Sequence, residues 1–255
     1  MSGAVGIEIA GVSKRFRSVH ALESIDLTVE PGEVVTLLGP SGSGKTTLLR
    51  IVGGLDEPTT GTVRVGDASP HDARAAKRIG FVPQSPALLP WRTVRANARL
   101  LLDVNRAAGT PNGTDPVDLL AEVGLAEFAD AYPHELSGGM QQRVAIVRAM
   151  ALGAPLLLMD EPFAALDEIT RADMRHLLAR LCERVATTVL FVTHSIAEAV
   201  FLSDRVAVLS ARPGRLVAVE PVDLPRPRRP ELEDDPAFFA VETRLRAHLH
   251  SGAGR

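Results

Sequence analysis

The segment GPSGSGKT, residues 39–46, constrains the fold of this chain more than any other stretch, because it requires a strand, a loop and a helix in that order. It follows the short apolar run EVVTLLG and precedes an apolar-periodic stretch that predicts a helix ending near Gly53–Gly54. Its glycines let the backbone wrap closely around phosphate groups, with N–H groups pointing inward. The pattern therefore predicts a phosphate-binding loop (P-loop), and an incidental glycine-rich turn is the weaker alternative.

This loop predicts a site for ATP and Mg²⁺. The N-terminus of the following helix adds partial positive charge. We expect Lys45 to reach the β- and γ-phosphates and the hydroxyl of Thr46 to ligate Mg²⁺. The predicted nucleotide-binding residues of the loop are Gly39, Pro40, Ser41, Gly42, Ser43, Gly44, Lys45, Thr46 and Thr47.

Two further apolar runs end in chemically active side chains. PLLLMDE places Asp160 and Glu161 after a predicted strand, and TTVLFVTH places His194 after another. Ligands bind at the C-terminal edges of parallel strands. We therefore expect Asp160 to hold Mg²⁺, Glu161 to orient or deprotonate the attacking water, and His194 to contact the γ-phosphate. A solvated sheet edge or a structural histidine is the alternative for each position taken alone.

The order of the predicted elements indicates an α/β fold with a P-loop NTPase core. Continuous apolar strands, with a helix at 168–185 between two of them, predict a mainly parallel sheet covered on both faces. The stretches GIEIA, IDLTV, GTVRV and RIGFVPQ predict further strands, and DRVAVLSARPGRLVAVE, residues 204–220, predicts a hairpin turning at Pro213–Gly214. The middle of the chain is mostly helical and predicts an inserted subdomain at about 92–153. After a linker at LPRPRRP, one face of a C-terminal helix carries Phe238, Val241, Leu245 and Leu249, which we expect to pack on the same domain.

Composition limits the partners and the compartment. The chain has 28 Lys and Arg residues and 31 Asp and Glu residues, so its charge is nearly balanced. This balance argues against nucleic acid as the main partner. The single cysteine, Cys182, cannot form an intramolecular disulfide, and we expect it to pack as a small apolar side chain. There is no recognisable signal peptide and no apolar run of the ~20 residues that span a bilayer. If the protein acts at a membrane, we expect another chain to span it.

The stretch ELSGGMQQRVAIVRAM, residues 135–150, makes the set of motifs specific for one protein family. Ser137, Gly138 and Gly139 open a predicted helix, which alone indicates only a capping turn or a small anion site. Together with the P-loop, the Asp160–Glu161 strand end and His194, it resembles the ATP-binding subunit of ABC transporters. The resemblance covers roughly residues 7–225 and implies the ABC ATPase fold, with an ATP-binding domain at 5–225 and a linker and amphipathic helix at 226–255.

The resemblance assigns roles that the residues alone do not. It implies that Ser137, Gly138, Gly139 and Gln141 close over the γ-phosphate bound by a second copy of the chain, in a dimer around two ATP molecules. It implies that Gln84 approaches Mg²⁺ and the attacking water, and that Asp167 lies at the dimer junction. Phe16 would stack on adenine with Val19 near the sugar, and a core aromatic is the alternative. Three positions depart from the commonest family pattern: Phe16 replaces Tyr, Met140 replaces Gln and Ala164 replaces Ser.

The resulting functional hypothesis is Mg²⁺-dependent ATP hydrolysis that drives import of a small solute. The expected partners are a second copy of the chain, a transmembrane permease and, indirectly, a solute-binding protein, with the chain peripheral to the cytoplasmic face of the membrane. A soluble ABC ATPase of DNA repair or translation, and an exporter or lipoprotein-releasing ATPase, are the alternatives. LLPWRTVRANA, LSARPGRL and DLPRPRR resemble the subfamily serving nitrate, sulfonate and taurine uptake.

The only tryptophan lies in the proline-broken segment PQSPALLPWRTV, residues 83–94. The resemblance implies that this loop receives a short cytoplasmic helix of the permease, with Leu88, Leu89 and Trp91 in the docking surface. The alternative places the indole of Trp91 between the two subdomains, because tryptophan is usually largely buried.

Overall fold

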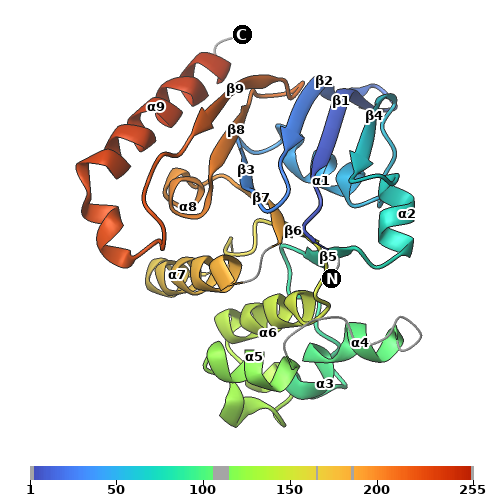
Figure 1. Ribbon diagram of the computed structural model, residues 1–255, viewed down its shortest axis with the longest axis vertical. Helices are drawn as coiled ribbons and strands as arrows, with labels where there is room; N and C mark the ends of the chain where they lie inside the picture. The colour runs from blue at the N-terminus through green and yellow to red at the C-terminus, as the bar shows by residue number, and fades with distance from the viewer. Residues whose placement is uncertain (1–2, 106–114, 165, 185–186, 254–255) are drawn as a thin grey trace.

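Two β-sheets with different pairing form the framework of the protein in a computed structural model, which describes residues 3–105, 115–164, 166–184 and 187–253 (Figure 1). The smaller sheet has the strand order β2 (Val19–Val29), β1 (Ile7–Phe16) and β4 (Thr60–Val65), all antiparallel. β1 and β2 are longer than GIEIA and IDLTV predict, because backbone pairing continues through irregular register to Phe16 opposite Val19. The hairpin thereby carries Phe16 to its tip.

The larger sheet contains the predicted parallel core. Its order is β5 (Ile79–Val82), β6 (Leu156–Asp160), β7 (Thr188–Thr193), β3 (Val34–Leu38), β8 (Arg205–Leu209) and β9 (Leu216–Pro221). The first five strands are parallel, and β9 pairs with β8 in the predicted antiparallel hairpin. The mixed α/β architecture expected from the sequence is confirmed.

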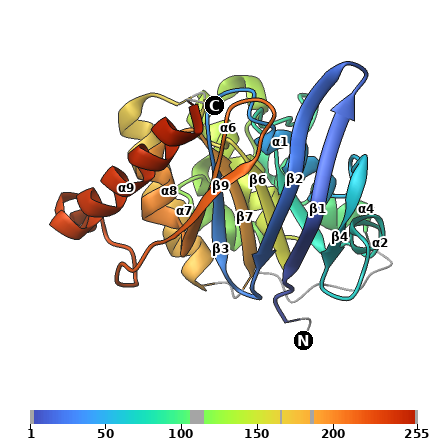
Figure 2. The same ribbon diagram turned by 90° about the horizontal axis from the view of Figure 1, so that it is seen from above.

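Alternate residues of the central strands enter two different cores, which is why their sequences are continuously apolar. In β3, Val35 and Leu37 face a core shared with the small sheet and α1 (Lys45–Val52). Val34 and Leu38 face the opposite core, which contains residues of α6 (Gly138–Met150), α7 (Glu168–Arg184) and α8 (Ile196–Leu202). The parallel sheet is thus covered on both faces (Figure 2).

Most of the remaining helices lie beyond β5 and β6 at one end of the molecule (Figure 1). There, α6 packs with α3 (Val94–Ala98), α4 (Leu100–Val104) and α5 (Pro116–Glu122). These four helices lie within the range proposed as a helical insertion, about 92–153, of which residues 106–114 lie outside the described residues. Short α2 (Pro70–Ala75) follows β4, and single 3₁₀ turns occupy Ala126–Phe128, Pro133–Glu135 and Pro230–Asp234. No helix in the described ranges is both long and apolar enough to cross a membrane.

The C-terminal helix α9 (Pro236–Ala253) packs on its own domain, as the apolar stripe predicts. Phe238, Val241 and Leu245 are buried in the core shared with α8 and β8, and Leu249 packs at its margin. Burial of this stripe leaves Phe239 as an exposed aromatic of the helix, at 51% exposure.

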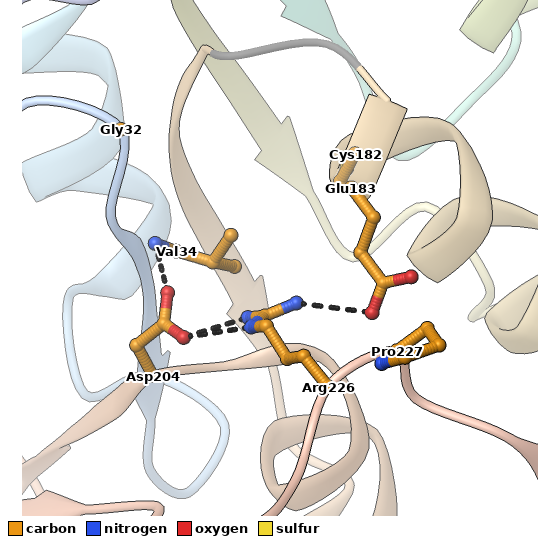
Figure 3. Close-up of a pocket in the computed structure, with 7 residues that line it drawn as sticks. All are labelled: Gly32, Val34, Cys182, Glu183, Asp204, Arg226 and Pro227. Atoms are coloured by element: carbon orange, nitrogen blue, oxygen red, sulfur yellow. Dashed lines mark hydrogen bonds and ion pairs between the residues drawn. The ribbon is translucent and has the colours of Figure 1, made fainter.

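The proline- and arginine-rich segment before α9 is held to the domain by ion pairs and hydrogen bonds. Arg226 pairs with Asp204 at 2.7 Å and with Glu183 at 3.4 Å (Figure 3). Arg228 is buried and donates hydrogen bonds to backbone carbonyl groups, while its own N–H donates to Glu183. The nearby Cys182 packs against the core as predicted, and burial raises the pKa of its thiol to about 12. The segment proposed as a linker thus fastens α9 to the end of α7 and the start of β8.

Candidate functional site

A pocket of about 420 Å³ opens beside the P-loop and gathers side chains from distant parts of the chain. The predicted P-loop residues in its wall are Ser41, Gly42, Gly44, Lys45, Thr46 and Thr47. Phe16, Gln84 and Glu161 reach the same wall from other elements. Folding therefore brings about half of the predicted nucleotide-binding residues, together with the predicted catalytic Glu161, to the wall of one pocket.

Lys45 begins α1 and lies folded against its own loop. Its ammonium group donates to the carbonyl oxygens of Gly39 at 2.8 Å and Pro40 at 2.9 Å. Burial lowers the pKa of Lys45, although the carboxylates of Glu161 and Asp160 oppose this effect. Gly39 and Pro40 thus serve the site through their backbone, and they hold a cation where phosphate oxygens can compete for it.

Backbone crowding explains the glycine at position 44. Gly44 has φ 87°, in the left-handed region. A Cβ atom there would lie 2.6 Å from the side chain of Leu22 and 2.9 Å from the carbonyl oxygen of Ala21. Ser43, also predicted as a nucleotide contact, is fully buried. A larger residue at position 44 would push the loop away from β2 and open the phosphate cradle.

Thr46 and Asp160 come together as the sequence predicts for a cation site. The hydroxyl of Thr46 donates to Asp160 Oδ1 at 2.8 Å, across 114 positions of the chain. Burial raises the pKa of Asp160; the Thr46 hydrogen bond opposes this shift and the charge of Glu161 adds to it. A hydroxyl and a carboxylate, with the Gln84 side chain on the same pocket wall, are the hard oxygen donors that Mg²⁺ prefers. The donor set fits the ion.

Glu161 and His194, two further predicted site residues, form a pair at the ends of neighbouring strands. His194 Nδ1 lies 3.1 Å from Glu161 Oε2, and the Glu161 carboxylate is mostly shielded from solvent. Glu161 takes φ 42°, which is uncommon for a residue with a side chain, and its N–H donates to Val192 in β7. The backbone is therefore held in an unusual conformation that carries the carboxylate to the pocket.

Phe16 stands at the mouth of the pocket and is 44% exposed, so the core-aromatic alternative is wrong. Lys14 Nζ lies 4.8 Å from its ring centroid and is also paired with Asp56 at 2.6 Å. Val19, opposite Phe16 in the hairpin, is 39% exposed and lines the same pocket. An exposed ring beside a phosphate-binding loop can stack on a planar base.

The LSGG segment forms a separate part of the protein surface. Ser137 caps α6 by accepting the N–H of Met140, and Gly138 follows in the first turn. Among the described residues that line the P-loop pocket, none comes from 137–141. The predicted P-loop residues and the predicted LSGG residues of one chain thus lie in different places.

Two side chains near LSGG point inward. The amide of Gln141 donates to the carbonyls of Pro133 and Leu136, so it braces the turn before α6. Met140 packs against the helical core, which gives the departure from glutamine an apolar role. Gly139 lies against α7, since a Cβ atom there would be 2.8 Å from Thr170 Cγ2.

Asp167 and Ala164 lie between β6 and α7. Asp167 accepts the N–H of Thr170 at 3.0 Å, and this backbone hydrogen bond lowers its pKa. The neighbouring Ile169 is 78% exposed, and Ala164 is half-buried. The exposed side chain of Ile169, next to Asp167 at the start of α7, leaves this part of the surface accessible to another chain.

Trp91 is 71% exposed, so the alternative that buries it between the two subdomains is wrong. The loop that carries it is nevertheless anchored. The fully buried Asn97 accepts the N–H of Leu89 and donates to the carbonyls of Leu89, Arg92 and Thr93. Arg148 in α6 donates to two further loop carbonyls, at positions 86 and 87.

Three residues of these regions were missed at the level of sequence. Asn97 and Arg148 have no local motif, because their partners are backbone atoms brought to them only by folding. Arg212 lines the P-loop pocket from the turn between β8 and β9. The sequence predicts a hairpin turn there, and LSARPGRL carries a subfamily resemblance, but neither signal points to contact with the nucleotide pocket.

Comparison with known proteins adds independent findings. A family model described as ABC transporter matches residues 22–164. The aliphatic sulfonates import ATP-binding protein SsuB 1 of Xanthomonas axonopodis pv. citri is 41% identical over 251 residues, covering 98% of each chain. The nitrate import ATP-binding protein NrtC of Synechococcus elongatus is 40% identical over 88% of this chain and 34% of its own length.

A solved structure matches the fold. The dimeric post-hydrolysis structure of the ATP-binding cassette MJ0796, bound to ADP and Pi, has a TM-score of 0.73 at 33% sequence identity. The match covers 86% of this chain and 99% of that one.

Proposed function

The chain belongs to the ABC transporter family and is an ATPase of that family, and from this premise we propose that it powers import of a small solute. The observation that carries the proposal is the convergence, at one edge of the sheet, of Lys45, the Thr46–Asp160 contact and the Glu161–His194 pair. The names of the sulfonate and nitrate relatives favour transport over a soluble role in repair or translation.

In the proposed reaction, each residue acts on a defined part of the substrate. The P-loop N–H groups and Lys45 bind the phosphates of ATP, and Phe16 stacks on the adenine. Glu161 orients the attacking water and accepts its proton, while His194 holds Glu161 and faces the γ-phosphate. Thr46, Asp160 and Gln84 would hold Mg²⁺, which neutralises phosphate charge when bound.

Two copies of the chain would complete the site. The P-loop pocket and the LSGG surface lie apart in one chain, and the related cassette MJ0796 has been solved as a dimer. We therefore assign Ser137, Gly138 and Gly139 to the γ-phosphate bound by the other copy, with Asp167 at the junction. The inward amide of Gln141 supports a bracing role in this surface.

The permease would dock on the Trp91 loop at the cytoplasmic face of the membrane, and a solute-binding protein would deliver the solute to the permease. An indole that is 71% exposed, beside half-buried Leu88 and Leu89, is the kind of apolar surface that partners cover. Anchoring by Asn97 and Arg148 lowers the entropy lost on docking.

Transport is tested in proteoliposomes that contain this chain, its permease and the solute-binding protein. We expect uptake of nitrate, taurine or an alkanesulfonate that requires ATP and stops with Glu161→Gln. ATP hydrolysis without uptake, together with tight binding to ribosomes or DNA, would contradict the import function.

Docking is tested by co-purification of tagged permease with Trp91→Ala. We expect at least a tenfold loss of captured ATPase, since aromatic anchors at interfaces contribute about 2 kcal/mol or more. The matched control is Phe239→Ala, which removes another exposed aromatic, on α9, and should leave capture unchanged. Equal capture of both variants would reject the docking surface.

A further inference from the structure

The turn between β8 and β9 is built into the wall of the nucleotide pocket. Gly214 donates its N–H to Ala21 and accepts the N–H of Glu23, both at 2.9 Å, which fastens the turn to β2 (Figure 1). A Cβ atom at position 214 would lie only 2.0 Å from the carbonyl oxygen of Ser43 in the P-loop. The turn is therefore in direct contact with the phosphate-binding loop.

Internal contacts hold this turn in one conformation. Ser210 Oγ accepts the N–H of Arg215 at 3.0 Å and lies within hydrogen-bond distance of the carbonyls of Ala211 and Pro213. The guanidinium of Arg215 pairs with Glu23 at 2.8 Å. One of the two arginines of the turn is thus committed to a structural ion pair.

The other arginine, Arg212, is oriented differently. It lines the pocket together with Phe16, Gly42 and Lys45. A Cβ atom on Gly42 would lie 3.5 Å from Arg212 Nη2, so the guanidinium lies over the P-loop. Within the described parts of the chain, the Arg212 side chain makes no hydrogen bond or ion pair.

The charged side chains in the pocket wall favour binding of an anion near Arg212. Lys45 and Arg212 are the cations among the described residues in its wall, where Glu161 supplies a negative charge. Lys45 is buried and bound to carbonyl groups, whereas Arg212 is exposed and able to move toward a ligand. A triphosphate carries more negative charge than Lys45 alone can neutralise. Guanidinium groups pair with phosphate through two parallel N–H donors.

We propose that Arg212 is a nucleotide-binding residue, whose guanidinium pairs with the phosphate chain of ATP from the side of the β8–β9 turn. This inference rests on the proposed ATP site and adds a contact that lies outside the P-loop, the strand-end carboxylates and LSGG. It makes the turn a determinant of nucleotide affinity in this chain.

The test compares binding of a fluorescent ATP analogue (mant-ATP) to Arg212→Ala, Arg212→Lys and Arg215→Ala in the full chain. Because a charged hydrogen bond at a partly solvated site is screened, we expect Arg212→Ala to weaken affinity about 3- to 30-fold. Arg212→Lys should lose less, since it keeps the charge but not the paired donors. Arg215→Ala, in the same turn, should change affinity less than about twofold, because an exposed ion pair contributes little.

Salt separates a charge contact from a packing effect. The difference between wild type and Arg212→Ala should shrink as NaCl rises from about 50 to about 300 mM, since screening weakens an exposed ion pair. Equal affinities of Arg212→Ala and wild type would overturn the inference. So would an equal loss in both arginine variants with lowered melting temperatures, because the turn would then act only by folding.

Binding of the same analogue to wild type and to Lys45→Ala distinguishes a failure of this inference from a failure of the proposed ATP site. If wild type fails to bind the analogue, the ATP site itself is wrong. If wild type binds and Lys45→Ala does not, but Arg212→Ala binds like wild type, only the role of Arg212 is rejected.

Discussion

Replacing Glu161 with glutamine tests the proposed chemistry most sharply. Gln has nearly the same shape, so the pocket wall keeps its form while the carboxylate is lost. A positioned general base contributes about 10²- to 10⁴-fold, which corresponds to about 2.7–5.5 kcal/mol of activation free energy. We therefore expect turnover at saturating Mg-ATP to fall by that factor.

Folding and ATP binding should survive the same substitution. The Glu161–His194 contact at 3.1 Å involves a histidine side chain that is 57% exposed, and exposed ion pairs contribute about 0–1 kcal/mol. Removing a negative charge from the pocket does not oppose the binding of a polyanion. We expect nucleotide affinity equal to or tighter than that of wild type, and ATP-dependent dimers that persist on size-exclusion chromatography.

The assay is phosphate release under steady-state conditions, with nucleotide binding measured in parallel. The control is Glu127→Gln, an exposed carboxylate outside the pocket, which should keep wild-type turnover. Turnover of Glu161→Gln within about threefold of wild type would refute the general-base role, since that corresponds to less than about 1 kcal/mol.

Three further predictions concern other parts of the molecule. Lys45→Ala should weaken ATP affinity about 10- to 100-fold in fluorescence titrations, since a charged hydrogen bond contributes about 1.5–3 kcal/mol; unchanged affinity would count against the phosphate-binding loop. Asn97→Ala should lower the free energy of unfolding by about 2–4 kcal/mol, because buried backbone groups lose their partners, and should lower the fluorescence anisotropy of Trp91, the only indole. Glu233→Gln should lower the free energy of unfolding measured in denaturant titrations at neutral pH. Burial of Glu233 opposes its ionisation, but hydrogen bonds from Arg175 and His176 outweigh this effect and lower the pKa of Glu233. The stabilisation by Glu233 is present above its ordinary pKa of 4.5 and is lost as pH falls through the lower pKa of the folded state. A stability difference between wild type and Glu233→Gln that stays constant on acidification would contradict this prediction.

Local sequence patterns are enough to predict the phosphate-binding loop and the parallel core of the fold. GPSGSGKT specifies its loop locally, because glycine conformation and the strand–loop–helix order are encoded within a few residues. The apolar runs ending at Asp160 and His194 predict parallel strands, and parallel strands bring their C-terminal ends to one edge without further information. The apolar stripe of α9 likewise predicted its own buried face.

How separated segments of the chain meet becomes visible only in the folded protein. The sequence left Trp91 either in a docking surface or between the two subdomains, and the fold exposes it because the anchors of its loop are backbone bonds to Asn97 and Arg148. Phe16 had a core alternative until the hairpin tip was placed at the pocket mouth. Arg212 and Arg215 are the same residue type in the same turn. Arg215 is nevertheless bound to Glu23, whereas Arg212 lies over the P-loop. Side-chain chemistry is local, whereas the partner that each side chain meets is a property of the folded chain.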